Sequence, residues 1–243
     1  MPKTPRLAHR KDPGKLENLP RPYRECRASS DHPQETADGG KKVSHGPIGT
    51  AKITASSLVK VNEDGEIVDP GATNRVNPAG FTIHSAVHIG RHDAAWVMHT
   101  HTRSGFAVSC LEEGLMPLNQ IALQYYGQIG YHDYEGIALD LEERERIVEA
   151  LGDNIALILR NHGLLTVGAT AGQMFSNMFY LNRACEIQES TLAMGRPLRA
   201  IDDTIIKRVS EQFSQMAYDD GDVALEWDAQ MRLADRLDPG FRD

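Results

Sequence analysis

"NIALILRNHGLLTVG" (residues 154–168) predicts two buried strands joined by a tight turn. The apolar runs ALIL and LLTV are rich in residues that favour strands. The letters RNHG between them include the Asn and Gly that turns prefer. We therefore expect a strand pair here, with His162 presented in its turn.

Helices are predicted on both sides of this strand pair. The preceding segment, residues 140–152, has apolar residues on one face, and Gly152 is a candidate for the helix end. Its charged letters DLEERERIVE predict a solvated face with pairs four residues apart. Residues 170–195 predict a long helix starting at Thr170, whose hydroxyl can accept from a free N–H of the first turn. Residues 202–239 predict two further helices.

The segments upstream mix strands and helices. We expect strand, turn and strand over 51–69, a helix over 81–92, a short buried strand over 94–101, a helix over 105–114, and a helix followed by an extended piece over 119–134. Strands that alternate with helices in a mixed order favour an α/β fold with a central, partly antiparallel sheet.

Two histidines end the strand at 94–101. Side chains two apart on a strand point to one face, so His99 and His101 aim together while Thr100 faces away. We expect the pair at a strand end rather than in the core. His162 is a candidate third ligand, because turns at strand ends can expose functional groups. Three imidazoles with one open position are typical of a catalytic zinc site, whereas the pair alone can be a solvated strand end.

The other histidines have simpler interpretations. His84 and His88 lie four apart on one face of the predicted helix, where they can pack or hydrogen-bond at the helix surface. His132, between Tyr131 and Tyr134, lies either near a site or in an ordinary loop.

Composition excludes several classes of protein. A chain of 243 residues that is 40% hydrophobic supports one good core. The net charge of −8 argues against nucleic acid as the main partner. No apolar stretch approaches the roughly 20 residues that span a bilayer, and the N-terminus lacks the apolar region of a secretory signal. The three cysteines lack paired spacing, which indicates a cytoplasmic protein, and we expect Cys110 and Cys185 in the core.

The first 47 residues differ from the rest. They hold 7 of the 12 prolines, and over residues 1–50 there are 10 Lys or Arg against 6 Asp or Glu, so this part is basic. Such a segment cannot bury enough apolar area to offset its ordering entropy. We expect a polar, mostly disordered leader over 1–47 and one folded domain over 48–243.

Several motifs together resemble the class II aldolase/adducin family. They are NPAGFTIHSAVH, VMHTHT, GYHDYEG and LILRNHGLLTVG, in this order. The step of 61 positions from His101 to His162 is also similar to that family's spacing. The resemblance runs from about Ile53 to the C-terminal FRD. The sequences of its motifs are closer to the adducin-head-like bacterial branch than to the sugar-phosphate aldolases.

The resemblance implies a layered αβα fold around a largely antiparallel sheet, and usually a homotetramer. It implies a divalent metal ion on His99, His101 and His162, most often zinc, with manganese, cobalt or iron as alternatives. In family enzymes the ion polarises a carbonyl group and stabilises an enediolate, which lets a carbon–carbon bond break.

The chain departs from the family at Gly80, where the aldolases carry an acidic residue nineteen positions before the first histidine. Retro-aldol cleavage needs a base, which here falls to His132, Tyr131 or a metal-bound hydroxide. Decarboxylation of a β-keto acid makes less demand on a base, because carbon dioxide leaves by itself and the metal ion only stabilises the electrons left behind. The leader also replaces the family's usual N-terminal helix, strand and phosphate-binding turn, and we expect a truncated, misassigned or diverged N-terminus.

We therefore expect a metal-dependent carbon–carbon lyase, an aldolase or a decarboxylase, acting on a small keto or hydroxy acid or a sugar-like compound. One alternative is a non-catalytic, adducin-like interaction domain, which the absent acid favours and the three histidines oppose. Another is a related epimerase or iron-dependent oxygenase, since three imidazoles also suit iron(II). Bound metal discriminates the lyase from the interaction domain.

Overall fold

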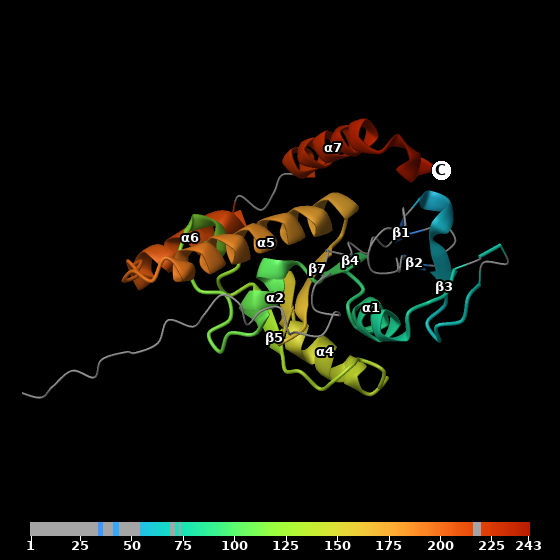
Figure 1. Cartoon of the computed structure of the whole chain (residues 1–243), viewed down its shortest axis with the longest axis horizontal. Helices are drawn as coiled ribbons and strands as arrows, with labels where there is room; N and C mark the ends of the chain where they lie inside the picture. Colours follow the sequence, from blue (N-terminus) through green and yellow to red (C-terminus); the bar gives the residue numbers. More distant parts are fainter. Residues whose placement is uncertain (1–33, 36–40, 44–53, 69–70, 73, 216–219) are drawn as a thin grey trace, which may run out of the picture.

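The computed structural model describes residues 34–35, 41–43, 54–68, 71–72, 74–215 and 220–243 (Figure 1). Its helices are η3 (Ala55–Ser57), α1 (Pro78–Gly90), α2 (Arg103–Ser109), α3 (Gln120–Leu123), α4 (Glu143–Leu151), α5 (Ala171–Ala193), α6 (Asp203–Gln215), α7 (Asp220–Leu237) and η4 (Pro239–Arg242). Its strands are β1 (Gln34–Glu35), β2 (Lys41–Val43), β3 (Val59–Val61), β4 (Trp96–Thr100), β5 (Ile129–His132), β6 (Ala156–Leu159) and β7 (Gly163–Gly168). Among these helices none is both long and apolar enough to cross a membrane.

Within the described residues the main sheet has four strands in the order β4-β7-β6-β5. β7 pairs antiparallel with β4 on one side and with β6 on the other, while β5 and β6 run parallel. The predicted strand pair at 154–168 is confirmed, with Leu159 opposite Gly163 at its turn. The expectation of a central, largely antiparallel sheet is confirmed as well.

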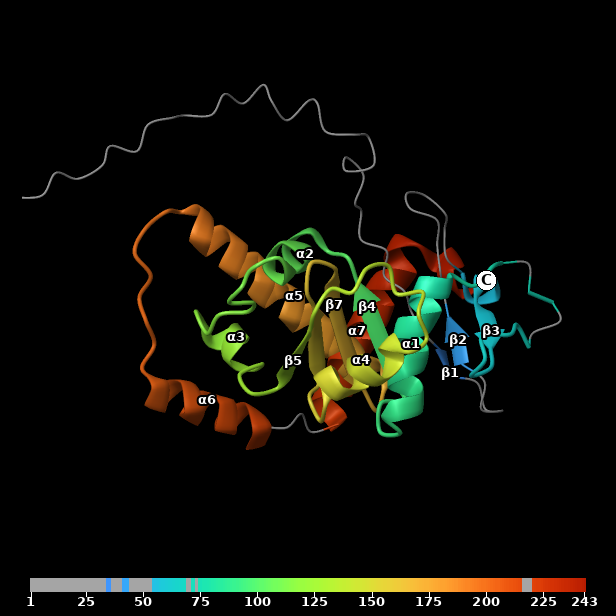
Figure 2. The ribbon, with the colours of Figure 1, turned by 90° about the horizontal axis from the view of Figure 1, so that it is seen from below.

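Helices cover both faces of this sheet. Leu157 and Leu159 of β6 pack with residues of α1 and α4, whereas Ala156 and Ile158 pack with residues of α2 and α5. Figures 1 and 2 show the same arrangement, with α5 on one side of the strands and α1 and α4 on the other. Because β6 is buried on both faces, its sequence is a continuous apolar run rather than an alternating one. The layered αβα fold is therefore confirmed.

A smaller sheet involves part of the predicted leader. β1 pairs antiparallel with β2, and β2 with β3. Five residues of the predicted leader form β1 and β2, and the rest of that leader lies outside the described residues, so the division of the chain at residue 48 stays a prediction. The strand pair expected over 51–69 is reduced to β3 and one bridge between Val61 and Ile67.

The cysteines divide between core and surface. Cys185 on α5 is buried, as expected, but Cys110 is exposed because α2 ends at Ser109, one residue before it. The expectation that both cysteines are core residues was therefore wrong for Cys110.

Thr170 caps the long helix α5 as its sequence predicted, because its side chain accepts from the backbone N–H of Gln173. We expect Thr170→Ala to lower the free energy of unfolding by about 1 kcal/mol, since this N–H loses its partner. Chemical denaturation checks the change, with Thr170→Ser as the control that keeps the hydroxyl. Equal stability of the Ala variant and the wild type would show that the cap contributes nothing measurable.

Candidate metal centre

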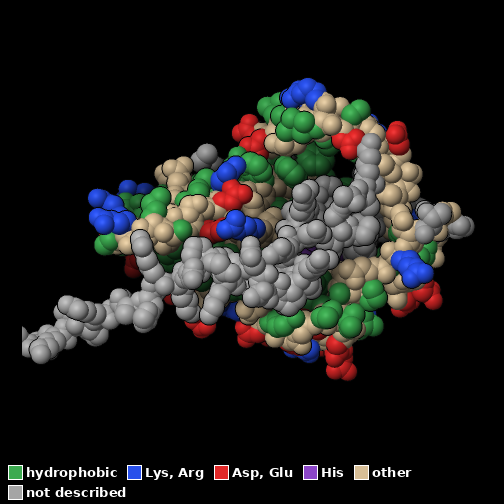
Figure 3. All heavy atoms as spheres, viewed as in Figure 1, with side chains coloured by type: hydrophobic (Ala, Val, Ile, Leu, Met, Phe, Trp, Pro, Cys, Tyr) green, Lys and Arg blue, Asp and Glu red, His purple; other side chains and the backbone are tan. Residues whose placement is uncertain are grey.

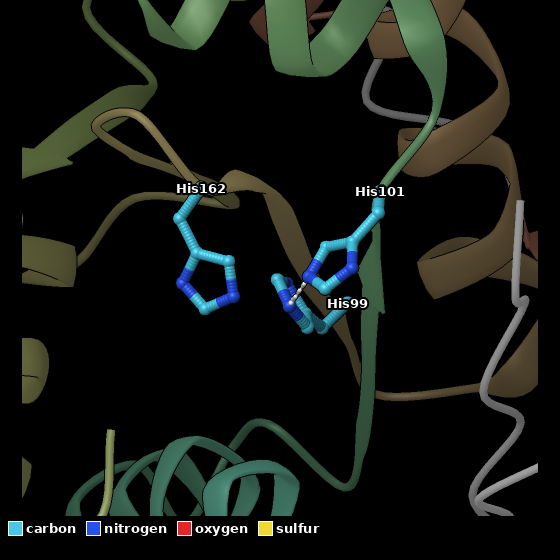
Figure 4. A group of neighbouring side chains, drawn as sticks. All are labelled: His99, His101 and His162. Carbon is cyan, nitrogen blue, oxygen red and sulfur yellow. Dashed lines mark hydrogen bonds between the residues drawn. The ribbon is translucent and has the colours of Figure 1, made fainter. Parts of the chain in front are cut away.

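Strand pairing brings the three candidate histidines together. In the β4–β7 register His99 lies opposite Leu165 and Thr100 opposite Leu164. β7 begins at Gly163, so the turn that carries His162 meets the end of β4. Figure 4 shows the side chains of His99 from β4, of His101 just after β4 and of His162 from the turn around one space.

The three imidazoles offer ligand atoms that all lie within 4.8 Å of one another. The Nε2 atoms of His99 and His101 are 2.8 Å apart, so both ring edges face the same point (Figure 4). The ring centroid of His162 lies 4.8 Å from that of His99 and 4.9 Å from that of His101. Within the described residues, this is the group of His, Cys, Asp or Glu side chains with the geometry to hold a metal ion.

His99 is oriented by the backbone of the neighbouring strand. Its Nδ1 lies 2.9 Å from the carbonyl oxygen of Leu164. Because a carbonyl oxygen only accepts, Nδ1 carries the proton and the lone pair of Nε2 faces the other histidines. Such outer contacts fix the tautomer of metal-binding histidines. His99 is only 6% exposed, so the expectation of a pair at a strand end outside the core was wrong for this residue.

The protein environment favours the neutral form of all three rings. Burial lowers the pKa of His99 well below its usual value, and the nearby His162 and His101 lower it further. Burial lowers the pKa of His101 as well. The pKa of His162 falls to about 4, first through burial and then through His101 and His132. A neutral imidazole is the form that binds a metal ion.

These observations fit a divalent ion. The donors are three imidazoles, from His99 at the end of β4, His101 just after it and His162 on the turn before β7, and their neutral form suits ligation. Zinc accepts nitrogen ligands of this kind, and a set of three protein ligands leaves a coordination position for a substrate. The residues present are therefore able to hold the ion that catalytic sites of this type use.

His132 lies near this centre with a carboxylate beside it. Its Nε2 is 3.1 Å from Oε1 of Glu143 on α4, and both residues are buried, at 7% and 6% exposure. His132 and His162 line the same small cavity, together with Glu143 and Tyr134. His132 therefore lies beside the histidine cluster, in the wall of the cavity that His162 also lines.

Glu143 is a residue that the sequence interpretation missed. Its segment was expected to be a solvated helix face, and for Glu143 this was wrong, because the first turn of α4 packs against the end of β5. The spacing of the helix could have found it, because Glu143 lies four and eight positions before Ile147 and Leu151 and therefore shares their buried face. Glu135, the other nearby carboxylate, is 4.0 Å from His132 and is held by Arg146 through contacts of 2.7 and 2.6 Å.

Tyr131 lies on the opposite face of the sheet from His132, because neighbouring strand residues alternate. Its hydroxyl accepts from the backbone N–H of Leu115 at 3.1 Å, and the guanidinium of Arg160 lies 4.7 Å from its ring centroid. Burial raises the pKa of its hydroxyl. The structure therefore does not bring Tyr131 to the three histidines.

The helix α1 places Gly80 and His84 one turn apart. Gly80 is buried in the first turn, where the side chain of Asn77 caps the helix by accepting from the N–H of Ala79. His84 is only 2% exposed, so the surface position expected for it was wrong. It lies near enough to the cluster for its charge to lower the pKa of His99.

Comparison with known proteins agrees with this fold. The profile of the Class II Aldolase and Adducin N-terminal domain matches residues 47–189. A Caulobacter vibrioides protein whose name places it among aldolase class 2 proteins is 48% identical over 197 residues, which is 79% of this chain and 74% of that protein. Alpha-adducin of Rattus norvegicus is 50% identical over 145 residues, which is 59% of this chain but 20% of the adducin.

Solved structures show the same fold. The crystal structure of an aldolase II superfamily protein from Pseudomonas syringae superposes with a TM-score of 0.80 at 40% identity, covering 90% of this chain and 87% of that one. L-fuculose 1-phosphate aldolase from Glaciozyma antarctica PI12 superposes with a TM-score of 0.69 at 24% identity over 88% of this chain and 83% of that one. The chain belongs to the class II aldolase and adducin family.

Proposed function

We propose that the protein is a divalent-metal-dependent carbon–carbon lyase, an aldolase or a decarboxylase, acting on a small keto or hydroxy acid or a sugar-like compound. The observation that carries this proposal is the convergence of His99, His101 and His162, whose ligand atoms lie within 4.8 Å of one another. A bound ion of the zinc, manganese, cobalt or iron type acts as a Lewis acid toward a carbonyl oxygen.

In this proposal, separate residues of the chain bind the ion and transfer the proton. His99, His101 and His162 hold the ion, and the carbonyl oxygen of Leu164 keeps His99 in the ligating tautomer. His132 exchanges a proton with the substrate, and the carboxylate of Glu143 at 3.1 Å positions its ring. This pair takes the place of an acid at Gly80. Because Tyr131 bonds to Leu115 on the other face, we assign it no proton transfer.

The test of this activity is a substrate screen on metal-reconstituted protein. The apoprotein, prepared with a chelator, is loaded separately with zinc, manganese, cobalt and iron(II), and each form is offered β-keto acids, hydroxy acids and sugar phosphates. We expect release of carbon dioxide or an aldehyde from the loaded wild type, and none from the apoprotein or from loaded His162→Ala. Equal turnover by the apoprotein would contradict the proposal, and oxygen uptake with iron(II) would favour an oxygenase.

A second candidate function is an adducin-like interaction domain without turnover. The 50% identity to rat alpha-adducin over 145 residues favours it, as does the glycine at position 80. The two candidates differ in bound metal, because an interaction domain has no chemical need for three converging imidazoles.

We further propose a homotetramer located in the cytoplasm, and light scattering of the purified protein tests the assembly.

A further inference from the structure

Four aromatic side chains lie together between α5 and α7, on the other side of the sheet from α1 and the histidines. We call this the aromatic groove; its members are Phe175, Phe179, Tyr180 and Trp227. They line a recess of about 140 Å³. Figure 3 shows hydrophobic side chains on α7 and in the recess between α7 and α5. A space of this size takes several water molecules or one small ligand.

The rings contact one another without filling the groove. The centroid of Phe175 lies 5.7 Å from that of Trp227 and 6.4 Å from that of Phe179. The ring centroid of Phe179 lies 5.2 Å from that of Tyr180, and Phe179 is 42% exposed, so one wall of the groove is open to solvent. The helices are held close at Gly172, where an added Cβ would come within 3.2 Å of Trp227, so the walls of the groove are positioned by backbone packing.

A carboxylate lies among these rings. Glu226 lines the same recess, and its two oxygens each accept one hydrogen bond, from the hydroxyl of Tyr180 at 3.0 Å and from that of Ser176 at 3.2 Å. These donors hold the carboxylate in place but leave about half of its acceptor sites unused. The groove therefore combines four aromatic rings, whose faces carry partial negative charge, with a full negative charge.

We infer that the aromatic groove binds a small alkylammonium cation, such as a quaternary ammonium group or the methylated end of a lysine side chain. Aromatic faces attract cations within about 6 Å, and an alkylated ammonium loses less hydration than a free one when it enters an apolar space. The guanidinium of Arg183, which also pairs with Glu186 at 2.8 Å, lies 5.8 Å from the ring centroid of Phe179, within the range of a cation–π contact. The inference does not depend on the lyase proposal, since none of the groove residues lines the histidine cluster.

The test is a titration of the full-length protein with tetramethylammonium chloride, followed by saturation-transfer NMR of its methyl signal and by tryptophan fluorescence. Sodium chloride at equal ionic strength controls for salt, and neopentyl alcohol is the uncharged probe of similar shape. We expect saturable binding of the cation and binding of the alcohol weaker by roughly tenfold or more. Phe179→Ala, at an exposed position, abolishes cation binding, and Glu226→Gln weakens it several-fold.

The matched control is Leu225→Ala, because Leu225 lies on α7 at 67% exposure and is not among the groove residues. This variant binds the cation like the wild type. No saturation transfer to the cation would overturn the inference. Equal binding of the alcohol would overturn it too, and would indicate an apolar contact surface, for example for a second copy of the chain. Unchanged cation binding in both Phe179→Ala and Glu226→Gln would place the cation elsewhere and overturn the inference as well.

Discussion

The His162→Ala variant is expected to purify folded and without a stoichiometric metal ion, whereas the wild type carries about one ion per chain. His162 lies on the turn before β7 and is partly exposed, so its removal leaves the sheet and both apolar cores in place. Two imidazoles then remain where three converged. Because loss of an outer-shell contact alone costs roughly 10–100-fold in metal affinity, loss of a ligand should cost more.

Elemental analysis by plasma mass spectrometry checks the metal content, and circular dichroism checks the fold. The matched control is His92→Ala, which removes an exposed histidine in the turn after α1 and should keep the metal. Metal retained by His162→Ala at the wild-type level would contradict the site. A wild type without metal, even after metal is added back, would favour the adducin-like interaction domain.

The second large effect is expected from Gly163→Ala. A Cβ at this position would lie 2.5 Å from the carbonyl oxygen of Thr100 and 3.1 Å from Cδ2 of His101. Neither strand can move away without disturbing the β4–β7 pairing that aligns His99 with Leu165. We expect a loss of about 1–3 kcal/mol in the free energy of unfolding, as in other overpacked interiors.

The same variant should also bind metal less tightly, by roughly 10–100-fold, because His101 and His162 are displaced relative to each other. Thermal unfolding and a competition titration with a chromophoric chelator measure the two effects. Gly195→Ala is the control, since it places a methyl group in open space at a positive φ of 60°. If Gly163→Ala matched this control in both measurements, the close approach would not be needed for the site.

Local patterns in the sequence were sufficient for several elements, but not for the strand pair expected over 51–69. The strands β6 and β7 follow from two apolar runs separated by Asn and Gly, and the start of α5 follows from the hydroxyl of Thr170. The shared face of His99 and His101 follows from the two-residue repeat of a strand. These features depend on residues a few positions apart, so the sequence is enough to predict them.

Contacts between distant residues needed the tertiary structure. The sequence makes His162 a candidate ligand but does not show where its side chain lies. The antiparallel pairing of β4 with β7 brings His162 to His99 and His101. The alternation of Tyr131 and His132 is readable from the strand, but which of them faces the histidines depends on which side α4 packs. The same packing buries Glu143, whereas Glu142 and Glu145 are exposed. The sequence by itself thus determined the strands β4, β6 and β7, the start of α5, the two-histidine motif and the family resemblance. Only the tertiary structure decided which side chains meet, because strand register and helix packing depend on interactions between residues far apart in the chain.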